Sequence, residues 1–314
     1  MTKVSKLVTH IISNSDSLDN VGLYYGKTGI SLALFEASRY LRNEVVEDKA
    51  FDILQQSLIF KDQNYSFENG LSGVGYVLCY LINNRFIEAD FDEIFGKQFE
   101  NIISNFEDID KNPHKLLNTL NVVYFLCEIN KLKQTDERLP RIIKFFFEGL
   151  ELFLIVQFHD FFDPCYLNNK MKVFKIFEIY LKLVNYVDYK FFSRVVLESY
   201  SDLYQKGITV NSIGIGFYLG MLVRKYSLTN YDKVVNDHII KGIENIRKDI
   251  LSLKEKIDCM KLLFDIESNR IIPLPVINID LLHEDININS YPLHYKGGLA
   301  RFLLFLVNKQ SVFL

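Results

Sequence analysis

Few residues in this chain have types and spacings that could support chemistry. The densest group of polar donors is the stretch 159–165, which reads His-Asp-Phe-Phe-Asp-Pro-Cys. Histidine, aspartate and cysteine are common zinc donors, and a paired cysteine and histidine can form an activated thiol nucleophile. The same letters also suit a turn between two helices, with Asp163 opening the turn before Pro164. A metal or thiol site and a polar turn therefore both remain open.

A second polar group lies near the end of the chain. His294 and Arg301 flank the glycine pair 297–298, and His283-Glu284 precedes it. At the start of a helix, Arg301 could contact a peptide carboxylate or backbone carbonyls, and the alternative is an ordinary surface charge. The chain has neither the Gly-x-x-x-x-Gly-Lys-Ser/Thr loop of a nucleotide site nor the Gly-x-Ser-x-Gly elbow of a hydrolase.

Composition and charge limit which cellular compartments and which binding partners fit this chain. The 314 residues are 49% hydrophobic with 26 Phe and 18 Tyr, enough for a large core, and the net charge is −3. We expect no general attraction to nucleic acid or to anionic membranes. The N-terminal apolar run is too short and too broken for a signal peptide or a membrane span. Four separated cysteines without a CxxC pair indicate reduced thiols and a cytoplasmic protein; they are Cys79, Cys127, Cys165 and Cys259.

The elements that must position these residues follow from a repeat. Gly26 and Gly29 open an apolar stretch, and Gly70 and Gly73 open another forty-four residues later. A period of this length is typical of folds built from one helical unit used many times. Fainter copies follow at 118–129, 167–181, 210–223, 258–266 and 295–307, with asparagines or Arg301 at some of the glycine places.

Between these copies lie helices of a second kind. Residues 48–60 and 231–250 carry apolar side chains at intervals of three and four with charges between them, which is typical of amphipathic surface helices. One buried and one amphipathic helix in each unit predicts two concentric layers, in an open solenoid or a closed ring. Residues 271–282 could form a short extended segment. Because no linker divides the chain, we expect one domain over residues 1–314.

The recurrent Gly-x-x-Gly starts, together with the closing P-L-H-Y-K-G-G-L-A-R-F-L-L-F-L-V-N, resemble the lanthionine synthetase C-like (LanC-like) proteins. The resemblance covers nearly the whole chain. It implies an all-α fold, an α/α toroid of seven inner and seven outer helices. Catalytic members of that family are peptide cyclases, in which a zinc ion held by two cysteines and a histidine activates a peptide cysteine. The resulting thiolate adds to a dehydrated serine or threonine.

This sequence departs from the family at the residues that carry that chemistry. Asn211 stands at the place of the first cysteine ligand, Cys259 matches the second, and Met260 replaces the histidine. A single thiolate cannot hold zinc, so we predict that zinc is absent. The family's acid and base positions fall near Asn168 and on His114. The candidate catalytic residues are therefore His114, Asn168 and Cys259, without an assigned role.

The resemblance also implies a central cavity that binds an extended peptide. The residues expected to line it are Gly26, Gly29, Gly70, Gly73, Asn211, Gly216, Cys259, Met260, Gly298 and Arg301. The predicted function is in the maturation of a ribosomally made, lanthipeptide-type peptide. The chain would act there as a non-catalytic partner of a modifying enzyme or as a divergent modifying enzyme.

Two alternatives come from other classes. One is a metal-free α/α-barrel enzyme acting on carbohydrate or lipid, which would need several carboxylates at the helix starts. The sequence offers Glu68, Glu107, Asp108 and Asp110 there. The other is an open helical scaffold without pocket chemistry.

Overall fold

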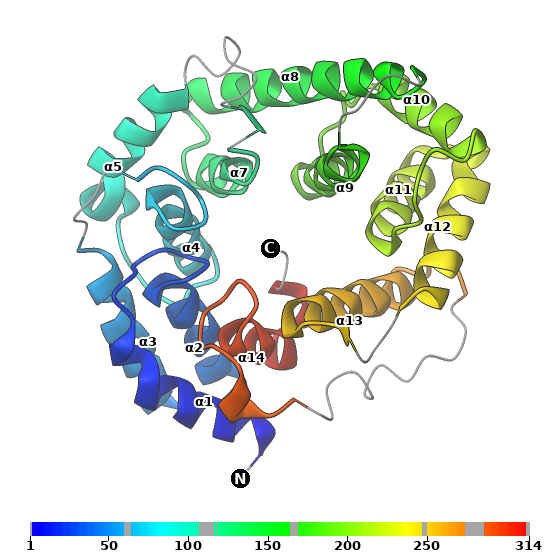
Figure 1. Ribbon diagram of the computed structural model, residues 1–314. Helices are drawn as coiled ribbons and strands as arrows, with labels where there is room; N and C mark the ends of the chain where they lie inside the picture. The colour runs from blue at the N-terminus through cyan, green and yellow to red at the C-terminus, as the bar shows by residue number, and fades with distance from the viewer. Residues whose placement is uncertain are drawn as a thin grey trace.

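The computed structural model describes residues 2–59, 64–106, 116–117, 119–163, 169–246, 250–273 and 286–311. Within these ranges the chain folds into thirteen α-helices and contains no strand. The helices form a ring of two layers around a central opening (Figure 1). The all-α class and the α/α toroid expected from the sequence are therefore confirmed.

The inner layer holds one helix for each expected copy of the repeat (Figure 1). Its members are α2 (Lys27–Leu41), α4 (Leu71–Asn83), α7 (Val122–Leu132), α9 (Lys170–Val187), α11 (Ile213–Tyr226), α13 (Leu253–Ser268) and α14 (Leu299–Val307). The outer layer consists of α1 (Lys3–Asn14), α3 (Glu44–Ser57), α5 (Phe91–Phe106), α8 (Arg138–Asp160), α10 (Arg194–Gln205) and α12 (Asp232–Glu244). The seventh outer helix that the resemblance implies is not among the described residues between α13 and α14, and it stays a prediction. Residues 274–285, which include most of the expected extended segment, lie outside the described ranges.

Burial separates the two layers as the hydrophobic patterns predict. In α4 every residue from Leu71 to Leu81 is buried, because this helix packs on several sides. In α3 the buried residues recur at intervals of three and four, which leaves one face in solvent. The helices expected at 48–60 and 231–250 are confirmed as the outer helices α3 and α12.

The ring closes between its first and last units. Helix α14 packs against α2, and α1 packs against α14. The backbone N–H of Lys296 donates to the carbonyl of Tyr24 at 2.9 Å, which joins the loop before α14 to the loop before α2. At the far ends of the same two helices, Asn308 Nδ2 donates to Glu36 Oε2 at 3.0 Å. These contacts contradict the open scaffold.

The glycine pairs allow the loop before an inner helix to fold back onto the helix start. Gly26, Gly70 and Gly298 are N-caps with nearly the same extended backbone angles. In these three units the first helical N–H donates to the carbonyl seven residues earlier, at 2.7–2.9 Å. A Cβ on Gly29 would lie 2.1 Å from the Leu23 carbonyl oxygen, and a Cβ on Gly73 would be as crowded. Backbone packing therefore explains why the motif recurs.

The sixth inner helix starts earlier than the repeat copy at 258–266 indicates. Helix α13 begins at Leu253, where Ser252 and Glu255 form a capping box. Ser252 Oγ accepts from the Glu255 N–H, and the Glu255 carboxylate accepts from the Ser252 N–H. Cys259 and Met260 consequently lie inside the helix rather than at its start. The Ser-Leu-Lys-Glu sequence is the signal that fixes this boundary.

Candidate functional site

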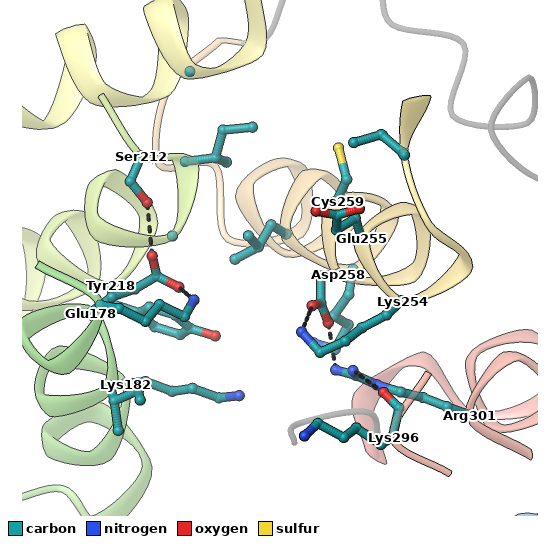
Figure 2. Close-up of a pocket in the computed structure, with 18 of the residues that line it drawn as sticks. Glu178, Lys182, Ser212, Tyr218, Lys254, Glu255, Asp258, Cys259, Lys296 and Arg301 are labelled. Atoms are coloured by element: carbon teal, nitrogen blue, oxygen red, sulfur yellow. Dashed lines mark hydrogen bonds and ion pairs between the residues drawn. The ribbon is translucent and has the colours of Figure 1, made fainter. Parts of the chain in front are cut away.

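A cavity of about 660 Å³ opens at the centre of the ring. Its wall comes mainly from α9, α11 and α13, with residues from the loops before α2, α4 and α14 and from the start of α14. Among its described lining residues are six basic and four acidic side chains, an excess of two positive charges. Figure 2 shows the charged side chains extending into this space from opposite walls.

The wall formed by α13 and α14 is built around Arg301. Its Nη2 lies 2.6 Å from Asp258 Oδ1, and its Nη1 donates to the Lys296 carbonyl at 3.2 Å. Lys254 Nζ lies 2.9 Å from the other oxygen of Asp258. Burial would raise the pKa of Asp258, but the charges of Arg301 and Lys254 outweigh burial and hold the pKa below its usual value. Arg301 is only 5% exposed, so the interpretation of Arg301 as a surface charge is wrong.

The opposite wall carries a polar stripe on α9. Lys175 Nζ lies 2.5 Å from Glu178 Oε1, and Ser212 Oγ donates to Glu178 Oε2 at 2.8 Å. Ser212 is the N-cap of α11 and accepts from the N–H of Ile215. A Cβ on Gly214 would lie 2.6 Å from Glu178 Cδ. This glycine therefore makes room for the Glu178 carboxylate at the start of α11.

Lys182 lies one turn further along α9 and has no ion-pair partner among the described residues. Its Nζ is 5.9 Å from the centre of the Tyr124 ring. In Figure 2 it extends across the cavity toward the group formed by Arg301, Asp258 and Lys254. Burial, and then the positive charge of Arg301, lower the pKa of Lys182 to about 7. The amine therefore titrates near neutral pH.

Lys296 and three tyrosines complete the polar part of the cavity. Lys296 Nζ lies 5.6 Å from the ring centre of Tyr24. Burial raises the pKa values of Tyr24, Tyr124 and Tyr218 well above the usual range for a phenol. These three side chains therefore stay neutral and can serve as hydrogen-bond donors.

The four acidic lining residues are already engaged. Asp258 is ion-paired, Glu178 binds Lys175 and Ser212, and Glu255 caps its own helix. Glu68 accepts from Asn121 Nδ2 at 2.7 Å. The pKa values of Asp258 and Glu255 are lowered, in Glu255 because Ser252 donates hydrogen bonds to the carboxylate. A glycosidase instead needs a carboxylic acid with a raised pKa, so the arrangement does not favour a sugar-cleaving enzyme.

The donors at the family's zinc positions do not fit a zinc ion. Asn211 and Cys259 both line the cavity, whereas Met260 is fully buried in the core. Across the described ranges, no group of three or more His, Cys, Asp or Glu side chains could hold a metal ion.

The other expected cavity residues divide by position. Arg301 lines the cavity with Asn211 and Cys259. Gly70 lines a second pocket of about 510 Å³ in front of α4. The remaining glycines pack against other segments of the protein. The loops before their helices contact Gly26, Gly29, Gly73 and Gly298, and α12 contacts Gly216. Peptide contact by any of them stays a prediction.

Several expected residues lie outside the described ranges, among them His114, Asn168, Cys165, His283, Glu284, Glu107, Asp108 and Asp110. His159 is described and lies in the last turn of α8, with its side chain 88% exposed and 3.8 Å from Asp160. Residues 161–162 form a turn and Asp163 a bend, and the turn expected from Asp163 into Pro164 continues outside the described ranges and stays a prediction. His294 is half-buried, and its ring lies 5.0 Å from the ring of Tyr25.

Sequence reasoning missed Lys175, Glu178 and Lys182. All three lie on one face of α9, at intervals of three and four residues, within a helix that is otherwise largely apolar. A polar stripe on a helix of the inner layer must face a cavity or another polar group, because the alternative is an unpaired charge in the core. That spacing was the available signal.

Comparison with known proteins supports the family expected from the repeats. Residues 2–133 match the model of the lanthionine synthetase C-like proteins, which covers the chain from α1 to α7. No match was found among curated proteins. Within the described residues, no helix is long and apolar enough to cross a membrane. The match over residues 2–133 and the ring of paired inner and outer helices make the chain similar to the lanthionine synthetase C-like proteins.

Proposed function

We propose that this protein acts in the maturation of a ribosomally made peptide. It binds an extended peptide or the loop of a peptide-modifying enzyme in its central cavity, and it does so without zinc. The family match and the cavity at the centre of the ring support a peptide role. It acts there as a non-catalytic partner of a modifying enzyme or as a divergent modifying enzyme.

The observation that carries the proposal is the donor set at the cavity. Asn211 and Cys259 reach the cavity wall, but Met260 lies in the core and places no donor there. Zinc in proteins takes three or four N, S or O donors. One thiol and one amide are too few to activate a peptide cysteine by the family's mechanism.

Metal analysis tests the zinc-free part. The chain is purified without chelator, dialysed against zinc, and measured by mass spectrometry of the metal alongside Cys259→Ser. We expect far less than one zinc per chain and no difference between the two proteins. One tightly held zinc per chain that is lost in Cys259→Ser would overturn this part and restore a zinc-dependent cyclase.

Peptide binding tests the rest. The probe is a fluorescent peptide that contains one dehydroalanine and one cysteine, followed by anisotropy and by titration of free thiol. Ile179 on α9 lines the cavity, so Ile179→Trp should weaken binding at least tenfold by filling it. Leu152 on the outer helix α8 is 65% exposed, and Leu152→Trp is the matched control. Equal binding by both variants would place the peptide elsewhere and contradict the proposal.

A further inference from the structure

We propose that the cavity holds an anion-binding site, formed by Lys182, Lys296 and Arg301, that binds one carboxylate or phosphate group of the ligand. The inference concerns the cavity of the proposed function and deepens it by naming the group recognised there. It does not need a peptide to be tested, because a small inorganic anion contains the same chemistry.

Three cations from different parts of the ring converge at the site. Lys182 comes from α9, Lys296 from the loop before α14, and Arg301 from the first turn of α14. In Figure 2 the Lys182 amine extends from one wall toward the guanidinium of Arg301, and the Lys296 amine lies near the same space. Neither Lys182 nor Lys296 has a carboxylate partner in the described part of the chain. Asp258 is shared by Arg301 and Lys254, so it neutralises only one of those two charges.

Arg301 is the most deeply buried of the three cations. The residue is 5% exposed. Its Nε is a buried donor with no hydrogen-bond partner among the described residues. Its other donors contact Asp258 and the Lys296 carbonyl. A buried donor without a partner is unfavourable, and more so when it is charged, so such groups are rarely left unsatisfied. An oxyanion in the cavity would offset the excess positive charge of the lining.

Anion binding and protonation of Lys182 are linked, so the site can be detected from the pH dependence of the binding affinity. Binding an anion favours the protonated amine of Lys182, which titrates near pH 7 in the free protein. Binding therefore takes up a proton, and affinity falls as pH rises above about 7, by up to tenfold for each pH unit. The groups acting on or facing Lys182 are Lys175 and Glu178 on α9, Tyr124 on α7, Tyr218 on α11, Asp258 and Asp265 on α13, and Arg301 on α14.

The test is calorimetric titration with sulfate, which keeps the same charge between pH 6.5 and 8.5. We expect one site per chain, with an affinity that falls about tenfold over that range. Lys182→Gln should weaken binding at least tenfold and flatten the pH profile. Lys182→Arg should keep binding and also be flat, because arginine stays protonated. Lys144→Gln, on the exposed face of α8, is the control for general charge effects and should bind as wild type.

Three results would overturn the site: wild-type affinity in Lys182→Gln, a pH slope that persists in Lys182→Arg, or equal loss in Lys144→Gln. Thermal unfolding of each variant checks that it is folded. None of these outcomes depends on the peptide assay, so failure of the anion site and failure of the peptide proposal are separate results.

The source of the anion is distinguished by three short probes. Acetyl-dialanine with a free carboxylate, its amide, and acetyl-phosphoserine amide are titrated in the same way. Stronger binding of the free carboxylate assigns the site to a chain end or acidic side chain. Stronger binding of the phosphoserine probe assigns it to a phosphate ester. Equal binding of all three would contradict recognition of the anion.

Discussion

Arg301 Nη2 and Asp258 Oδ1 lie 2.6 Å apart and join the last inner helix to the sixth across the wall of the cavity. Arg301 occupies the place that Gly29 and Gly73 hold in the first two units. In the first two units a glycine at this position allows a close approach of the backbone. In the last unit the same position carries the buried charge of Arg301, which needs an oppositely charged partner. Two units are thereby linked by an ion pair that also shapes the site.

The first prediction concerns this pair. Arg301→Ala should lower the free energy of unfolding by about 2 kcal/mol, less than for a fully buried pair because Asp258 is 34% exposed. Urea unfolding of Arg301→Ala, Asp258→Asn and the double variant measures the coupling. Lys49→Gln, in a pair whose side chains are both 53% exposed, should change stability by less than about 0.5 kcal/mol. Strictly additive losses would mean that the pair contributes no coupling energy.

The second prediction compares glycines that differ in their surroundings. A Cβ on Gly73 would lie 2.0 Å from the Phe67 carbonyl oxygen, a distance that only a backbone shift can relieve. We expect Gly73→Ala and Gly29→Ala each to cost at least about 2 kcal/mol through overpacking. The matched control is Gly96→Ala on α5, where the nearest atom would be at 3.5 Å. That variant should be neutral or more stable by up to about 1 kcal/mol.

Chemical denaturation of the three alanine variants measures these differences. Alanine favours a helix more than glycine does, so helix propensity alone should stabilise all three variants. A loss in Gly96→Ala as large as that in Gly73→Ala would therefore show that the close approach of the preceding loop does not set the requirement for glycine. If the close approach matters, the denaturant midpoints of Gly29→Ala and Gly73→Ala should fall together, because both glycines face a carbonyl six residues earlier.

The repeat was readable from the sequence because its physical cause is local. At positions 26, 29, 70 and 73 a Cβ would clash with the carbonyl oxygen of the residue six positions earlier. Glycine therefore recurs wherever the preceding loop folds back onto the helix start. The start of α13 could also have been placed, since Ser252 and Glu255 form a recognisable capping box. Both features depend on short stretches of chain.

The cavity was only partly readable because its contacts are long-range. Arg301 and Asp258 are forty-three residues apart and meet only once two units are stacked. Lys296 reaches the cavity from a loop, where no periodicity marks its direction. Lys182 could have been found from the polar stripe on α9. Whether its amine has an ion-pair partner depends on the side chains that face it from α13 and α14, and only the closed ring shows which residues those are.

The third prediction concerns ring closure through Glu36. This carboxylate is 5% exposed, accepts from the Tyr80 hydroxyl on α4, and accepts from Asn308 at 3.0 Å just after α14. Tyr80→Phe and Asn308→Ala each remove one donor from a buried charge, so each should cost about 1–3 kcal/mol. The matched control is Tyr40→Phe, because Tyr40 is 58% exposed. Thermal unfolding measures the stability of the three variants. A loss of stability in Tyr40→Phe as large as that in Tyr80→Phe and Asn308→Ala, or a loss in Tyr40→Phe alone, would contradict the role of Glu36.

The last prediction concerns His238, which lies fully buried between α10 and the start of α11. Its Nδ1 accepts from the backbone N–H of Ser212 at 3.1 Å, and its Nε2 lies 2.9 Å from the Tyr200 hydroxyl. Because a backbone N–H can only donate, Nδ1 carries no proton and the ring is neutral. Burial lowers the pKa of His238 to about 4, from an ordinary value of 6.5, against the opposing charge of Asp237.

The sign of the pH dependence follows from these two values. Between pH 4 and 6.5 the unfolded chain binds the proton at His238 and the folded chain does not, so stability rises with pH over that window. The contribution is complete above pH 6.5, is lost as the pH falls toward 4, and amounts to about 3 kcal/mol at most. Urea unfolding of wild type and His238→Gln at pH 4.5, 5.5, 6.5 and 7.5 isolates it from other titrating groups. The advantage of wild type should be largest at pH 7.5 and shrink toward pH 4.5. A difference that stays constant would show that protonation of His238 does not oppose folding, and the link between α12 and the cavity wall at Ser212 would then be insensitive to acid.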